Sequence, residues 1–66
     1  MIDLKEIGAR CKEFRLSMGI LQIRVAEDTG YSLENVSKFE TGRNDNYRIL
    51  LWYLEHGIDV NYLLRG

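Results

Sequence analysis

Glycines divide this sequence into short segments, and this division constrains the fold more than any other feature. Gly19, Gly30, Gly42 and Gly57 each follow a segment with apolar residues at helical spacing. Steps of three and four place side chains on one face of an α-helix, and a glycine directly after such a segment commonly ends the helix. The sequence contains no proline and no alternation long enough for a strand. We therefore predict a single all-α domain of five short helices over residues 1–66.

The first predicted helix begins after Asp3 and ends at Gly19. Its apolar residues step by three and four along one face, and they are Leu4, Ile7, Cys11, Phe14 and Met18. Asp3 has a short carboxylate of the kind favoured at N-caps, and Glu6 completes a weaker form of the capping box. Gly8 costs about 1 kcal/mol relative to alanine inside a helix. We therefore expect another helix to approach closely at Gly8.

The second and third predicted helices form a closely spaced pair. The second covers residues 22–29, and its inner face comprises Ala26, Thr29 and either Ile23 or Val25. The third covers residues 33–41, with Ser32 as its N-cap and with Val36 and Phe39 facing the core. Two short helices separated by a glycine-centred turn of three to four residues are the signature of a helix-turn-helix unit, here about 22–41.

The fourth predicted helix, over 47–56, is apolar nearly all round. One face cannot account for all of its large apolar residues, which are Ile49, Leu50, Leu51, Trp52, Tyr53 and Leu54. We therefore expect a partner to cover part of this helix. A short fifth helix over 59–64 adds Val60 and Leu63. These two residues, with neighbours on the fourth helix, are predicted to form a homodimer interface.

Composition limits the classes of function. The single cysteine, Cys11, excludes an intrachain disulfide and favours a reducing cytoplasm. The longest apolar run, 49–54, is far shorter than the ~20 residues of a membrane span. Cys11 is expected to be a buried small hydrophobe and His56 a helix C-cap. With no second histidine and no carboxylate cluster, we expect no metal site, no cofactor and no catalytic residues.

Several short motifs recur in a familiar order and spacing. They are Gly19-Ile20-Leu21-Gln22, Val25-Ala26, Gly30-Tyr31-Ser32, Val36-Ser37 and Phe39-Glu40-Thr41-Gly42-Arg43, followed by the closing segment 57–66. This series resembles the Cro/repressor-type (xenobiotic-response-element-like) helix-turn-helix family, whose familiar members are the lambdoid phage repressors. The resemblance covers nearly the whole chain. It implies a phage or mobile-element type of transcriptional regulator that binds double-stranded operator DNA as a homodimer.

The same resemblance implies roles for individual residues. The residues predicted to contact base edges are exposed positions of the third helix: Leu33, Glu34, Ser37 and Lys38. The residues predicted to bind phosphates are Gln22, Arg43, Asn44 and Arg48. A structural ion pair joins Arg15 and Glu40. Lys38 would donate to guanine, Glu34 would accept from a cytosine amine, and Leu33 would touch a thymine methyl group. Leu21 stands where the family usually has Ser or Thr, a loss of about 1 kcal/mol in capping.

A second function remains open at this point. The net charge is −1 and the pI about 5.7, and phosphate attraction supplies most non-specific affinity for nucleic acid. Glu34 also has the wrong sign for contact with phosphates. These features, with the apolar surface of 47–64, favour a protein–protein interaction module with weak or no DNA binding.

Overall fold

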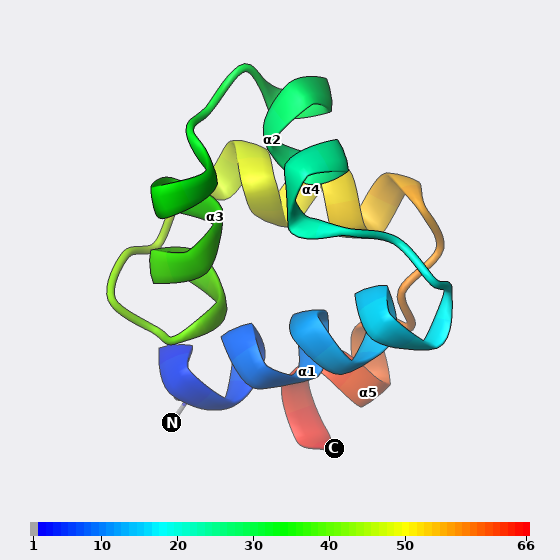
Figure 1. Ribbon diagram of the computed structural model, residues 1–66. Coiled ribbons are helices and arrows are strands. Elements are labelled where there is room, and N and C mark those ends of the chain that lie inside the picture. The colour runs from blue at the N-terminus through cyan, green and yellow to red at the C-terminus, as the bar shows by residue number, and fades with distance from the viewer. Residues whose placement is uncertain (1) are drawn as a thin grey trace.

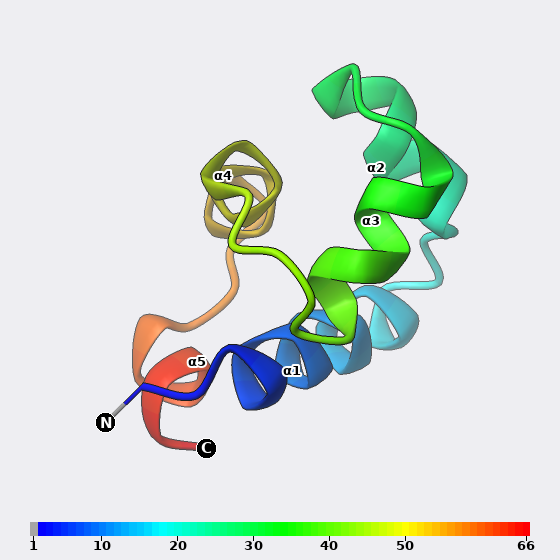
Figure 2. The same cartoon turned by 90° about the vertical axis from the view of Figure 1, so that its left-hand side faces the viewer.

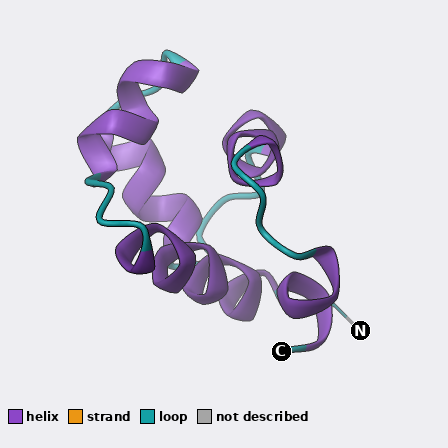
Figure 3. Ribbon diagram, turned by 90° about the vertical axis from the view of Figure 1, so that its right-hand side faces the viewer, coloured by secondary structure: helices purple, strands orange, loops and turns teal. Residues whose placement is uncertain are grey.

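The computed structural model describes residues 2–66 as five α-helices joined by short connections (Figures 1 and 3). The helices are α1 (Leu4–Ser17), α2 (Gln22–Thr29), α3 (Leu33–Glu40), α4 (Tyr47–Glu55) and α5 (Val60–Arg65). The all-α class and the five helices predicted from the sequence are confirmed. None of the helices within residues 2–66 has the length and apolar character that a membrane span requires.

Helix boundaries follow the capping chemistry of the sequence. The side chain of Asp3 accepts a hydrogen bond from the backbone N–H of Lys5 at 2.9 Å. Ser32 caps α3 in the same way, through the N–H of Asn35 at 3.2 Å. Gly30 ends α2 with a φ of +77°, a left-handed conformation that glycine adopts without steric cost. The predicted starts of α1 and α3 and the predicted end of α2 are therefore confirmed.

Two features of capping differ from expectation. Glu6 does not complete a capping box; its carboxylate lies instead 3.8 Å from the guanidinium of Arg10, one turn later. Asn46 is a further N-cap that the sequence analysis missed, since its side-chain oxygen accepts bonds from the backbone N–H groups of Arg48 and Ile49 in the first turn of α4, at 3.0 and 3.3 Å. Leu21 provides no side-chain cap for α2, as the sequence predicted.

Aromatic residues from three helices meet at the centre of the domain. Tyr53 is completely buried, and its ring stacks on Phe39 of α3 with 6.1 Å between ring centroids. Trp52 contacts the same tyrosine edge-on at 5.0 Å, and Phe14 of α1 contacts it at 6.3 Å. Burial of such large rings removes much apolar surface from water and stabilises the core of a chain this short.

The predicted apolar face of α1 is wrong at both ends. Leu4 and Met18 are 45% and 47% exposed, whereas Ile7 and Cys11 are buried. Toward the C-terminal end of α1, the charged residue Arg15 is buried in place of an apolar one. Apolar spacing alone cannot anticipate this, because a charge becomes tolerable inside a protein only when a partner from another helix neutralises it.

α4 is covered by its own chain more fully than expected. Ile49, Trp52 and Tyr53 are buried, and Leu50 and Leu54 are half-buried. Figure 2 looks along α4 and shows α2 and α3 on one side of it, with α1 and α5 below. The chain itself therefore covers one side of α4, and Tyr47 and Leu51 are the large apolar residues of this helix that stay exposed; cover by a partner over that part stays a prediction.

Leu63 also has a different place from the one predicted. It is only 3% exposed and belongs to the hydrophobic core, so its side chain cannot contribute to the predicted dimer interface. Val60, one turn earlier on α5, is 51% exposed and stays on the surface.

In α2, the sequence left open whether Ile23 or Val25 belongs to the inner face. Val25 is completely buried and Ile23 is 47% exposed, so Val25 is the inner residue.

Gly8 permits the close approach that the sequence predicted. A Cβ atom at this position would lie 2.7 Å from the carbonyl oxygen of Glu40, and closer still to that of Phe39. Both neighbours are backbone atoms at the C-terminal end of α3. α1 and α3 therefore touch, backbone against backbone, at the only helix-interior glycine within the described residues.

Candidate nucleic-acid interface

α2 and α3 are joined by a three-residue turn, 30–32, and together form a helix-turn-helix unit at one side of the domain (Figure 1). The inner side of α3 is anchored by Val36 and Phe39, which are 0% and 4% exposed. Ala26, 4% exposed, lies on the facing side of α2, where a small residue lets two helices pack closely. This packing leaves the opposite side of α3 facing solvent.

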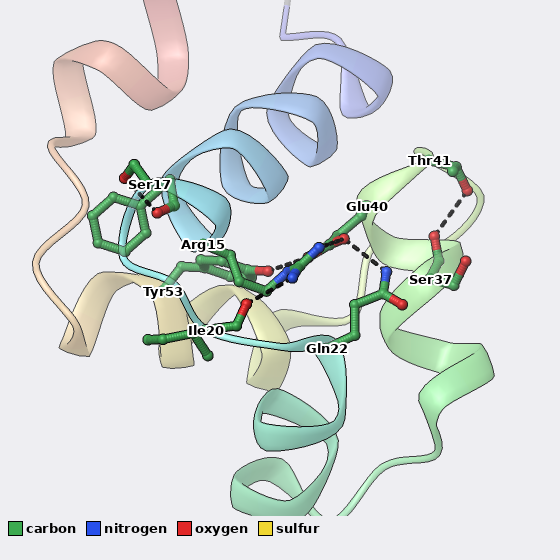
Figure 4. A network of polar contacts seen from close by, with 9 residues as sticks. Arg15, Ser17, Ile20, Gln22, Ser37, Glu40, Thr41 and Tyr53 are labelled. Atoms are coloured by element: carbon green, nitrogen blue, oxygen red, sulfur yellow. Dashed lines mark hydrogen bonds and ion pairs between the residues drawn. The ribbon is translucent and has the colours of Figure 1, made fainter.

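A buried ion pair fixes the C-terminal end of α3 to α1 (Figure 4). The guanidinium of Arg15 donates to both carboxylate oxygens of Glu40, through Nε at 2.8 Å and Nη2 at 3.2 Å. Its third nitrogen, Nη1, donates to the carbonyl oxygen of Ile20 at 2.7 Å. Arg15 and Glu40 are 4% and 3% exposed. The ion pair predicted between them is therefore present, and it is bidentate.

Two further side chains bind the same carboxylate, and the sequence analysis missed both contacts. The amide Nε2 of Gln22 donates to Glu40 at 2.9 Å, and the hydroxyl of Tyr53 donates to its other oxygen. Burial by itself raises the pKa of Glu40, but the hydrogen bonds from Arg15, Tyr53 and Gln22 outweigh it and hold this pKa below its ordinary value. Glu40 is therefore an anion at neutral pH. The side chain of Gln22 points to this carboxylate (Figure 4), so its backbone N–H and the second hydrogen of Nε2 are the donors that remain for the predicted phosphate contact.

The outer side of α3 presents the four residues predicted to read bases. Leu33 is 47% exposed, Glu34 and Ser37 are exposed, and Lys38 is half-exposed. The ammonium of Lys38 lies 3.0 Å from the carboxylate of Glu34, one turn earlier. The two charged base readers therefore pair with each other in the free protein. Exposed pairs of this kind contribute only about 0–1 kcal/mol, so the pair can open when a better partner arrives.

The structure separates the predicted phosphate-binding residues into two places. Arg43 lies directly after α3, where its backbone N–H donates to the carbonyl oxygen of Lys38 at 2.8 Å and its side chain is exposed. Asn44 shapes the same loop, since its side chain accepts a bond from the N–H of Asn46 at 3.3 Å. Arg48 lies in the first turn of α4 and lines a hollow beside the C-terminal end of α2.

A shallow hollow of about 430 Å³ lies where the N-terminal ends of α2 and α3 approach α1. Lys12 contributes an exposed cation to it, and Leu21, Ile23 and Leu33 contribute apolar side chains. The N-terminus of α2, without a capping side chain, opens beside it. Free N–H groups and a lysine together can hold an anionic group. Sequence reasoning missed Lys12, because its place beside the hollow depends on how α1 packs against α2 and α3 and no local pattern marks it.

Cys11 and His56 occupy structural positions. Cys11 is completely buried, and this burial, with the charge of Glu40, raises the pKa of its thiol to about 12. His56 caps α4, with Nδ1 lying 2.8 Å from the carbonyl oxygen of Trp52 and its ring stacked on the indole at 3.7 Å. The interpretations of Cys11 as a core residue and of His56 as a C-cap are confirmed.

The surface around α3 thus joins hydrogen-bonding, cationic and apolar groups on one rigid support. Glu34 and Lys38 stand on the helix, Arg43 follows its C-terminal end, and Lys12 lies near its N-terminal end. No family model matches the chain, and no curated protein or solved structure matches it either. What this surface binds therefore has to be inferred from its own residues and their geometry.

Proposed function

We propose that this protein binds double-stranded DNA through the outer side of α3 and regulates transcription in the cytoplasm, repressor-like, as a homodimer on its operator. The observation that carries the proposal is the division of α3 into two sides. Val36, Phe39 and Glu40 fix the inner side, and the outer side presents only side chains that the core does not use. A helix held in this way keeps its outer residues in a fixed register, as sequence reading requires.

The residues on the outer side suit the edges of base pairs. The major groove of B-DNA is about 12 Å wide and admits an α-helix. Lys38 can donate to guanine O6 and N7, Glu34 can accept from the amine of cytosine, and Leu33 can contact the methyl group of thymine. Ser37 lies between these positions and can donate or accept. These groups favour a half-site that contains both G·C and A·T pairs.

The Glu34–Lys38 pair also supports low affinity for unrelated DNA. Its charges cancel in the free protein, where the two groups lie 3.0 Å apart. If a phosphate becomes the partner of Lys38, the carboxylate of Glu34 is left unpaired near the DNA backbone. If Lys38 instead binds a guanine and Glu34 binds the amine of a neighbouring cytosine, both side chains have a suitable partner. Arg43, Arg48 and Lys12 remain as cations for phosphate contacts, so affinity for unrelated DNA should be modest and sensitive to salt.

Selection of bound duplexes from a random DNA pool tests the proposal directly. The expected result is enrichment of one short motif, repeated with two-fold symmetry at a spacing of about one helical turn, 10–10.5 base pairs. A variant with the outer side of α3 replaced by alanine at Leu33, Glu34, Ser37 and Lys38 is the control, since these residues lie outside the core. Enrichment of the same motif by this variant, or of no motif by the native chain, would contradict the proposal.

Removal of Lys38 and removal of Arg43 are expected to have different consequences. Lys38→Ala should weaken binding to the best site by about 1–3 kcal/mol and relax the preference at one base pair. Arg43→Ala should weaken binding to all sequences nearly equally and lower the salt slope by about 1 unit, because it loses one phosphate contact. Binding curves on specific and scrambled duplexes across a salt series measure both effects.

The control for this comparison is Arg65→Ala, which removes an exposed cation at the end of α5. It should leave the specific affinity and the base preference unchanged. If Lys38→Ala weakens binding to both duplexes by the same factor, Lys38 does not read sequence and the assigned reading surface is wrong.

A second candidate function is a protein-interaction module. The apolar side chains of Leu21, Ile23 and Leu33, which are 70%, 47% and 47% exposed, favour it because they line one hollow. The acidic pI of about 5.7 supports it as well. A gel shift against random genomic fragments at two salt concentrations separates the two candidates. Salt-sensitive shifts support DNA binding, and the absence of any shift at low salt supports the protein partner.

A further inference from the structure

The outer side of α4 carries an exposed stripe opposite its buried side. Tyr47, Leu51 and Glu55 follow one another at steps of four, and Arg48 lies beside them. Tyr47 is 64% and Leu51 47% exposed, and both charged residues are exposed. Together with Asp28, Thr29 and Trp52, these residues line a hollow of about 390 Å³ between α4 and the C-terminal end of α2.

The two charges of this stripe are without ion-pair partners. Neither Arg48 nor Glu55 takes part in an ion pair within residues 2–66. Asp28, the other charged residue of the hollow, is already engaged: it accepts from the indole Nε1 of Trp52 at 2.9 Å and pairs with Arg24 at 3.2 Å. The free charges of the hollow are therefore one cation and one anion, at opposite ends of the stripe.

Both free charges also oppose the dipole of their own helix. The N-terminal end of a helix favours anions and the C-terminal end favours cations. Arg48 lies in the first turn of α4, and Glu55 is its last residue. Each therefore lies at the less favourable end of its own helix. A second helix running antiparallel to α4 reverses this relation, because its C-terminal end lies beside Arg48 and its N-terminal end beside Glu55.

We propose that the outer side of α4 binds a second copy of this chain, with the two α4 helices antiparallel about a two-fold axis near Leu51. Positions 48 and 55 are equally distant from the midpoint between residues 51 and 52. In this arrangement Arg48 of each chain faces Glu55 of the other. Two reciprocal ion pairs then flank a contact between the two Leu51 side chains, as an isologous interface requires.

This interface gives a structural basis to the homodimer of the proposed function, on which it rests, and it alters two earlier predictions. The contact lies on α4 and not on Val60 and Leu63 of α5. Arg48 binds a carboxylate of the second copy and not a DNA phosphate. Because the contact involves no residue of α3, it forms without DNA, and its test does not depend on whether α3 reads a sequence.

Charge reversal tests the proposal by sedimentation of the free protein over a concentration series. Arg48→Glu and Glu55→Arg are each expected to weaken self-association at least tenfold, because each places two like-charged pairs in the interface. An equimolar mixture of the two variants should associate as strongly as the native chain, because every facing pair in the mixed dimer is then opposite in sign. The double variant R48E/E55R should also recover most of the association, because its facing pairs are again opposite in sign; it should stay somewhat weaker than the native chain, because the reversed charges oppose the dipole of the facing helix.

Two controls complete the experiment. Lys5→Glu reverses an exposed charge on α1 and should leave association unchanged, as should Val60→Glu on α5; far-ultraviolet circular dichroism verifies that every variant is folded. A native chain that is monomeric up to about 1 mM overturns the proposal. So does a mixture that associates no better than its components, or a loss of association in Val60→Glu with none in Arg48→Glu. A DNA-binding defect in a chain that still dimerises counts against the proposed function alone.

Discussion

Glu40→Gln is expected to lower the free energy of unfolding by about 3–5 kcal/mol. Glutamine retains the size of the side chain but removes the negative charge that neutralises Arg15, and the guanidinium is then left buried and unpaired. Tyr53 also loses a charged acceptor. A chain of this length is stable by roughly 3–10 kcal/mol in total. Thermal unfolding followed by circular dichroism should therefore show the variant largely unfolded, or melting far below the native chain.

A matched control is available on the same helix. Glu34→Gln makes the identical chemical change in an ion pair whose carboxylate side chain is 74% exposed, and should cost at most about 1 kcal/mol. The double variant R15M/E40L removes both buried charges and should regain much of the stability lost by Glu40→Gln, because apolar residues of similar size often replace a buried pair without loss. Equal melting temperatures for the two glutamine variants would show that burial of the pair is unimportant.

Gly8→Ala should destabilise the fold by about 3 kcal/mol, because the added methyl group would overlap backbone atoms at the end of α3. The nearest atoms include the carbonyl group of Glu40, at 2.7 and 2.8 Å, and a backbone cannot rotate away as a side-chain end can. Helix propensity alone gives the opposite sign, a gain of about 1 kcal/mol. Denaturant titration measures the difference in unfolding free energy.

The neighbouring residue provides the comparison. Ala9 is exposed on the same helix, and Ala9→Gly should cost about 1 kcal/mol through propensity alone. Gly8→Ala adds a methyl group and Ala9→Gly removes one, yet both substitutions should lower the free energy of unfolding. A gain of stability in Gly8→Ala would mean that α1 and α3 do not approach at this glycine.

The local parts of the fold could be predicted from the sequence. The caps Asp3 and Ser32 bond to N–H groups within three residues of themselves, and Gly30 needs only its own backbone freedom to end α2. Such features depend on neighbouring residues and are therefore visible in the order of the sequence. Asn46 was equally local and could have been recognised as a cap from its place before the apolar run of α4.

Predictions that depended on tertiary contacts succeeded only in part. The pair Arg15–Glu40 came from a family resemblance, but the additional bonds of Gln22 and Tyr53 to the same carboxylate link residues 18 and 13 positions away from it. No periodicity along the chain encodes such contacts. Leu63 was assigned to a dimer interface because an apolar helix has no visible inner side until its neighbours are placed. The contact between Lys38 and Glu34, one turn apart, was not predicted although their spacing allows it.

The separation of α3 into an anchored and an exposed side affects how such a protein can diverge. Val36 and Glu40 support the architecture, whereas Leu33, Ser37 and Lys38 contribute no side chain to the core. Exchanges at the outer positions therefore carry little penalty in folding. A population of such chains can explore new ligands by single substitutions on α3 while its architecture stays unchanged, and selection on recognition is then largely uncoupled from selection on stability.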